Sequence, residues 1–151
     1  MPPMNVPLVP RVVGGPLRVL VIGRISTVHQ DLESIEASYR YVSRHLGRLY
    51  QGPLHLKQLG EQGSGLRSDR PSIVEAEREI ATGTWDLVIA EDLSRIYRNP
   101  RLIYAFVQDA VQCETRVIGI GDNLDTADEN WEVALGAAAL EHLLRDDRDE
   151  R

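Results

Sequence analysis

Four short apolar runs constrain the fold of this chain more than any other feature. Residues 17–23 (LRVLVIG), 86–90 (DLVIA) and 116–120 (RVIGI) are apolar at nearly every position, and residues 54–59 form a weaker run. Continuous runs of this kind are typical of strands that are buried on both faces of a parallel sheet. The runs therefore predict four strands in the interior of the protein.

Segments with the periodicity of amphipathic helices separate these strands and follow the last one. They span residues 31–46, 71–83, 99–107 and 131–144. Pro71 suits a first helical position, Asn99 suits a capping position before Pro100, and Gly47 and Gly83 are expected to end helices. The alternation predicts an α/β fold, with a mainly parallel sheet of four to five strands and helices on both faces.

The length of 151 residues fits one folded domain with a substantial core. Residues 1–16 are rich in proline and glycine and are expected to form a flexible N-terminal segment. Residues 17–128 are expected to form the folded core. Residues 129–151 are expected to contain the start of a C-terminal helix and an acidic tail.

Charge and composition exclude several classes of function. The formal net charge of −6 argues against a domain whose main task is to grip a long DNA duplex, so any affinity for DNA must be local. Cys113 is the only cysteine, which excludes a disulfide or a thiolate zinc site within one chain. A secretory signal and an apolar run long enough to cross a membrane are both absent, so we expect a cytoplasmic protein without a membrane partner.

Serine and arginine residues follow three of the expected strands. Ser26 comes two residues after Arg24, Ser64 precedes Arg70, and Glu91 is followed by Arg95. Ligands of open α/β sheets bind outside the carboxyl ends of the strands, so these side chains are expected on one surface. A hydroxyl nucleophile among guanidiniums is the equipment for attack on a phosphodiester, because guanidiniums neutralise the charge of the transition state.

Each of these features also has a plain structural interpretation. Ser26 is a good helix cap, and the glycines around Ser64 are typical of a flexible surface loop. Glu91 and Arg95 have the spacing of an ion pair on a helix. The four histidines have no metal-ligand spacing, and Asp122 is more simply explained by a turn than by Mg²⁺ binding, so no metal site is expected.

Five blocks of the sequence, taken together, resemble the catalytic domain of the serine recombinases, the superfamily of resolvases, invertases and large serine integrases. The resemblance extends over residues 17–145, and the blocks occur in the family's order. The blocks are R-x-S-T-x-x-Q at Arg24–Gln30, S-I-E-A at Ser34–Ala37, S-G-x-x-x-x-R-P at Ser64–Pro71, a relative of D-R-L-S/G-R at Glu91–Arg95, and D-T at Asp125–Thr126.

The resemblance implies a recombinase that cleaves DNA through a 5′-phosphoserine intermediate on Ser26 and rejoins it without ATP, metal or any other cofactor. It implies DNA as the partner, a homodimer that assembles into a tetramer at synapsis, and a bacterial or phage source. It places Arg24, Arg70 and Arg95 around the scissile phosphate, Gln30 and Ser64 in support, Glu91 at the acidic position, and Arg67 and Arg98 in contact with DNA. It also implies that residues 129–151 begin a dimerisation helix and that the DNA-binding region is absent.

One departure from the family pattern leaves a further hypothesis open. Asp92 stands where the family has an arginine, and Arg98 is a candidate to replace that cation. The alternative hypothesis is that the domain is a catalytically compromised module that serves oligomerisation or regulation. A flavodoxin-like nucleotide-binding domain would also explain the alternation of strands and helices, but not the placement of the arginines.

Overall fold

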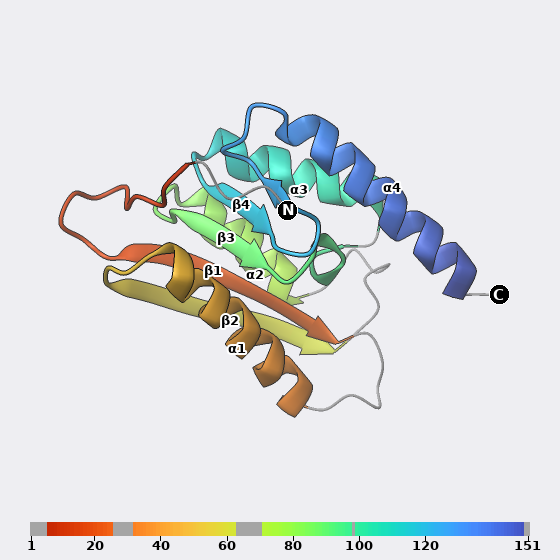
Figure 1. Cartoon of the computed structure of the whole chain (residues 1–151), viewed down its shortest axis with the longest axis horizontal. Helices are drawn as coiled ribbons and strands as arrows, with labels where there is room; N and C mark the ends of the chain where they lie inside the picture. Colours follow the sequence, from red (N-terminus) through yellow and green to blue (C-terminus); the bar gives the residue numbers. More distant parts are fainter. Residues whose placement is uncertain (1–5, 26–31, 63–70, 98, 150–151) are drawn as a thin grey trace.

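The computed structural model describes residues 6–25, 32–62, 71–97 and 99–149. The sequence of elements alternates between strands and helices, as expected (Figure 1). The strands are β1 (Leu17–Ile25), β2 (Leu54–Gln62), β3 (Leu87–Ala90), β4 (Arg116–Gly119) and β5 (Leu124–Asp125). The helices are α1 (Leu32–Leu49), α2 (Pro71–Ala81), the short 3-10 helix η1 (Leu93–Arg95), α3 (Pro100–Gln112) and α4 (Trp131–Asp149).

The strands form one sheet in the order β2-β1-β3-β4-β5. The first four strands are parallel to one another, and β5 pairs with β4 in the antiparallel direction. The predicted α/β fold, with a mainly parallel sheet of four to five strands, is confirmed. The parallel pairing brings the carboxyl ends of β1, β2 and β3 to the same edge of the sheet (Figure 1).

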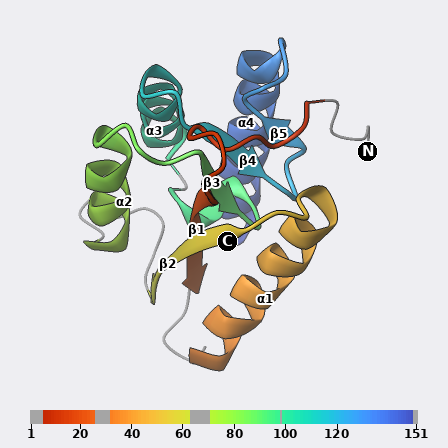
Figure 2. The same ribbon diagram turned by 90° about the vertical axis from the view of Figure 1, so that its left-hand side faces the viewer.

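Helices cover both faces of the sheet (Figure 2). On one face α1 packs on β1 and β2, and its Val42 and Leu46 are buried against Val19 and Val21 of β1. On the other face α2 and α3 cover a larger cluster that includes Trp85 and Phe106, and α4 packs on α3 and β5. The sheet is therefore the central layer of the molecule.

Two helix starts and one helix end follow the sequence signals. The Asn99 side chain accepts hydrogen bonds from the backbone N–H groups of Arg101 and Leu102, and α3 then begins at Pro100. The helix α2 begins at Pro71 and ends before Gly83, whose φ of +72° suits a glycine. The predicted end of α1 at Gly47 is wrong, because the helix continues to Leu49, which packs on the core.

Residues 6–16 precede β1, and some of them contact the folded core. Leu8 is buried in the cluster on the α1 face of the sheet. The Arg11 guanidinium donates hydrogen bonds to the carbonyl groups of Cys113 and Glu114, and Arg116 donates to those of Val6 and Pro7. Leu8 and these hydrogen bonds therefore attach the segment before β1 to the folded core. The division of the chain at residues 16 and 128 stays a prediction.

Candidate active site

The register of the sheet sets the starting points of the loops that carry the predicted site. Ile22 of β1 pairs with Ala90, the last residue of β3, and Gly23 pairs with Gly60 of β2. Arg24 is two residues after Ile22, so it lies beyond the end of β3, where Glu91 follows Ala90. Because β1 continues to Ile25, residues 23–25 extend past the end of β3, and β1 contacts the turn η1 that follows β3.

Two of the predicted site side chains are described, Glu91 and Arg95. Arg24 is described by its backbone, which lies at the end of β1 and pairs with Glu61. The other predicted residues lie outside the described part of the chain: Ser26, Gln30, Ser64, Arg67, Arg70 and Arg98. The structure thus tests the β3 side of the site and the backbone frame, and the roles of the remaining residues stay predictions.

A capped 3-10 turn positions Arg95. Leu93 is fully buried below the turn. The Asp92 carboxylate accepts hydrogen bonds from the backbone N–H and the hydroxyl of Ser94, with 2.9 Å between the Ser94 nitrogen and the carboxylate oxygen. An aspartate in this position caps the first turn of a helix. The carboxylate at the position where the family has an arginine is therefore part of the local structure of the loop.

The Arg95 guanidinium lies between two carboxylates. Its Nη2 is 3.5 Å from Glu91 Oε1, and its Nε is 3.9 Å from Asp92 Oδ2. The side chains of Arg95, Glu91 and Asp92 are 25%, 34% and 24% exposed. The ion pair between Glu91 and Arg95 predicted from their spacing is present. Because two anions accompany one cation, these three residues together do not attract a phosphate.

The turn after β4 holds the Arg95 loop from the other side. The Gly121 N–H donates to the Glu91 carbonyl at 2.7 Å, and Asp122 Oδ2 accepts from the Leu93 N–H at 2.6 Å. The turn interpretation of Asp122 agrees with this structure, in which Asn123 has a left-handed φ of 54°. Sequence reasoning did not link Asp122 to Leu93, because the two residues are 29 positions apart and meet only in the folded chain.

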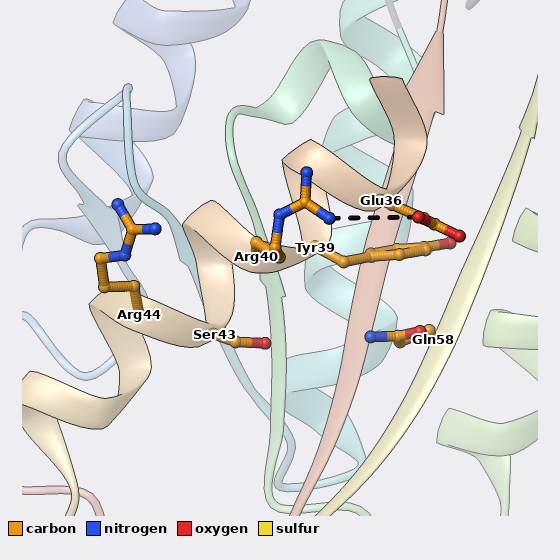
Figure 3. Close-up of a pocket in the computed structure, with 6 residues that line it drawn as sticks. All are labelled: Glu36, Tyr39, Arg40, Ser43, Arg44 and Gln58. Atoms are coloured by element: carbon orange, nitrogen blue, oxygen red, sulfur yellow. Dashed lines mark ion pairs between the residues drawn. The ribbon is translucent and has the colours of Figure 1, made fainter. Parts of the chain in front are cut away.

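The helix α1 contacts the site through two neighbouring residues. The Ser38 hydroxyl donates a hydrogen bond to Glu91 Oε1 at 3.1 Å. Tyr39, which Figure 3 labels, packs on the backbone of β1 at Gly23. A Cβ atom at Gly23 would lie 2.8 Å from the ring. Burial raises the pKa of Tyr39. Sequence reasoning missed Ser38, although a serine on the apolar side of a helix is a signal that a polar partner lies opposite.

The described residues contain no group of three or more histidine, cysteine, aspartate or glutamate side chains that could hold a metal ion. Among the described helices, none is long and apolar enough to span a bilayer.

Solved structures of serine recombinase catalytic domains share this fold. The N-terminal catalytic domain of TP901-1 integrase superposes with a TM-score of 0.62 at 20% identity, covering 86% of this chain and 97% of that one. A resolvase family site-specific recombinase from Streptococcus pneumoniae has a TM-score of 0.64 at 18% identity, covering 89% and 92%. A serine recombinase from Sulfolobus solfataricus has a TM-score of 0.55 at 16% identity, covering 70% and 69%.

The chain thus has the α/β fold of these recombinase domains. The sequence profile described as the N-terminal domain of resolvase matches residues 19–148, and the chain belongs to this family. No curated protein matches the chain significantly. Membership of the family supports a role in site-specific DNA recombination.

Proposed function

We propose that this chain is the catalytic domain of a DNA recombinase and that Ser26 is its nucleophile. The observation that supports this most is the register of the sheet: β1, which ends one residue before Ser26, extends past the end of β3 and contacts the turn η1 that carries Arg95. A hydroxyl group and guanidiniums at one sheet edge are the groups needed to attack a phosphodiester. The family match over residues 19–148 supports the same chemistry.

In the proposed reaction, Ser26 Oγ forms a bond to a DNA phosphorus and the bond from that phosphorus to the 3′ oxygen breaks. The serine loses its proton, the 3′ oxygen takes up a proton, and the products are a 5′-phosphoserine ester and a free 3′ hydroxyl. Rejoining is the reverse, with a 3′ hydroxyl as the attacking group and Ser26 as the leaving group. The ester keeps the phosphate activated, so the exchange needs neither ATP nor a metal.

Charge balance assigns the supporting roles. Glu91 and Asp92 outnumber Arg95, so the phosphate needs further cations, which we assign to Arg24 and Arg70. In this proposal Gln30 and Ser64 support the phosphate site, and Arg67 and Arg98 contact DNA outside it. Glu91 orients Arg95, which it contacts.

We assign DNA and further copies of this chain as partners, in the cytoplasm. Apolar side chains on α4 stand in solvent, with Val133 75% exposed, Leu140 55% and Leu144 52%. Exposed apolar residues along one helix suit packing against another copy. This helix is the candidate contact in a dimer that pairs into a tetramer during strand exchange.

A second candidate function rests on the charge of the Arg95 loop. With Asp92 3.9 Å from Arg95, the domain would bind DNA phosphate more weakly than a loop with arginine in that place. A recombinase-like module that assembles with other copies without cleaving DNA would have this property.

Covalent trapping on DNA separates the two candidates. The purified chain would be incubated with a library of random duplex fragments, and DNA that stays attached to denatured protein would be recovered and sequenced. After nuclease and trypsin digestion, mass spectrometry should find a 5′-linked nucleotide in the tryptic peptide of residues 25–40. The adduct should be lost in Ser26→Ala and kept in Thr27→Val, which changes the neighbouring hydroxyl.

Two outcomes would contradict the proposal. An adduct that persists in Ser26→Ala would assign the nucleophile to another residue. A chain that assembles into dimers but gives no adduct on any fragment would favour the non-cleaving module.

A further inference from the structure

One carboxylate oxygen connects α1 to the arginine of the candidate site. Glu91 Oε1 accepts a hydrogen bond from the Ser38 hydroxyl at 3.1 Å and lies 3.5 Å from Arg95 Nη2. Ser38 is only 8% exposed, so this bond is shielded from water on the helix side. The position of the Glu91 carboxylate relative to Arg95 is therefore set in part by a helix that is distant in sequence.

The hydrogen-bond partner of the Ser38 hydroxyl is unusual for a serine inside a helix. A serine inside a helix commonly bonds to the carbonyl one turn earlier, which satisfies it locally. Here the hydroxyl bonds to a residue 53 positions later in the chain. A buried hydrogen bond between two elements favours one relative position of these elements. A movement that breaks the bond leaves its acceptor without that donor, which costs free energy.

The neighbouring contact strengthens the same connection. Tyr39 lies on Gly23, directly before Arg24 in β1. The two adjacent residues of α1 thus touch the end of β1 and the segment after β3. The helix α1 is also the element that follows Ser26 in the chain. A shift of α1 would disturb its contacts with Gly23 and with Glu91 together.

We infer that Ser38 is a positioning residue of the site: through Glu91 it orients the Arg95 guanidinium and holds α1 in register with it. The catalytic consequence of this inference rests on the proposed function, whereas the link from Ser38 to Arg95 does not. No sequence motif of the site includes Ser38.

The link is tested by NMR on the chain without DNA. The Nε–Hε cross-peak of Arg95, assigned by its absence in Arg95→Lys, should shift in Ser38→Ala. It should shift likewise in Ser38→Cys, which keeps the volume but replaces the hydroxyl by a weak donor. Ser43→Ala is the matched control, since Ser43 lies on the same helix and lines an open groove of about 430 Å³ between α1 and β2 (Figure 3).

A double-mutant cycle separates positioning from general support of the fold. If Ser38 acts through Glu91, adding Ser38→Ala to Glu91→Ala should cause no further shift of the Arg95 cross-peak. Equal shifts in both backgrounds, or no shift in Ser38→Ala and Ser38→Cys, would overturn the inference.

Covalent trapping measures the consequence for catalysis. Ser38→Ala should slow formation of the Ser26 adduct about tenfold, as expected for losing a hydrogen bond to a charged group. Ser43→Ala should leave the rate unchanged. If the unaltered chain forms no adduct, the proposed function fails, and the cross-peak cycle still decides whether Ser38 positions Arg95.

Discussion

Arginine has different roles at the two ends of the parallel strands, which we call the amino edge and the carboxyl edge of the sheet. At the amino edge, Arg116 makes a two-point ion pair with Asp125, with nitrogen–oxygen distances of 2.7 and 2.6 Å, and the side chains are 14% and 7% exposed. At the carboxyl edge, Arg95 lies 3.5 Å from Glu91 and 3.9 Å from Asp92, with higher exposure. A short, buried pair holds its geometry, whereas a longer, wetter one can rearrange when a charged ligand arrives.

Other charges of the amino edge also serve the fold. Asp86 accepts hydrogen bonds from the backbone N–H groups of Arg11 and Arg18 at 2.7 and 2.8 Å. The Arg18 guanidinium lies over the Trp85 ring, 4.5 Å from its centre. The comparison teaches that the count of ion pairs says little about a site. Their lengths and burial indicate which arginines are committed to structure.

The largest effect is expected from breaking the amino edge. Arg116→Met should lower the free energy of unfolding by about 3–5 kcal/mol, because it leaves the buried Asp125 carboxylate without its cation. Arg116 also holds the carbonyl groups of Val6 and Pro7, so the N-terminal segment should loosen. Urea denaturation followed by tryptophan fluorescence measures the loss.

Arg95→Met is the matched change at the carboxyl edge, and its cost should stay below about 1 kcal/mol. Adding Asp125→Asn to Arg116→Met should restore part of the stability, because the unpaired charge is then gone while the acceptor for the Ala127 N–H remains. Similar losses for Arg116→Met and Arg95→Met would break the distinction between the two edges.

A smaller effect is expected from removing one charge at the carboxyl edge. Asp92→Asn keeps an oxygen that can cap η1 but removes an anion 3.9 Å from Arg95. Inorganic sulfate should then bind about fivefold more tightly, which corresponds to the roughly 1 kcal/mol of two charges at this distance in water. Titration followed by the Arg95 cross-peak measures this affinity.

Asp92→Arg tests the family pattern at the same position. It restores the missing cation but removes the cap of η1, so its effect combines both changes. A large gain in DNA cleavage would show that a phosphate contact was missing, and no change would show that it was not needed. Unchanged sulfate affinity in Asp92→Asn would show that Asp92 does not weaken the site.

The fold could be predicted because its signals are local. Continuous apolar runs marked the strands, and Asn99 with Pro100 marked the start of α3. The strand β5 was not placed as a separate element, because its two residues form a strand only by pairing with β4. The helix α1 passed its predicted end at Gly47, since packing of Leu49 outweighs the low helix propensity of glycine.

The site could be predicted only in part. The i, i+4 spacing was enough for the Glu91–Arg95 pair, because both residues lie in one turn. The contacts of Glu91 with Ser38 and of Leu93 with Asp122 join residues 53 and 29 positions apart, and no spacing rule connects them. The capping role of Asp92 was also missed, because the family pattern drew attention to its charge.

The smallest effect concerns two glutamates of α2. They extend the comparison between charges that stabilise the fold and charges that do not. Hydrogen bonds from Trp85 and Lys57 lower the pKa of Glu79, whereas burial raises the pKa of Glu77. The ionised Glu79 therefore stabilises the fold above its ordinary pKa, and this contribution is lost as the pH falls through its lowered value. The ionised Glu77 is unfavourable at neutral pH, and that penalty disappears as the pH falls through its raised value.

Glu79→Gln should thus lower the melting temperature at pH 7. The corresponding loss in the free energy of unfolding should be less than about 1 kcal/mol, and it should become smaller as the pH falls. Glu77→Gln, two residues away on the same helix, should raise the melting temperature at neutral pH, and its gain should vanish in acid. Its amide oxygen can still accept the hydrogen bond from the Tyr97 hydroxyl. Thermal melts between about pH 3 and pH 7 span both transitions. If the melting temperatures of the two variants depended on pH in the same way, the hydrogen bonds from Trp85 and Lys57 to Glu79 would not stabilise the fold.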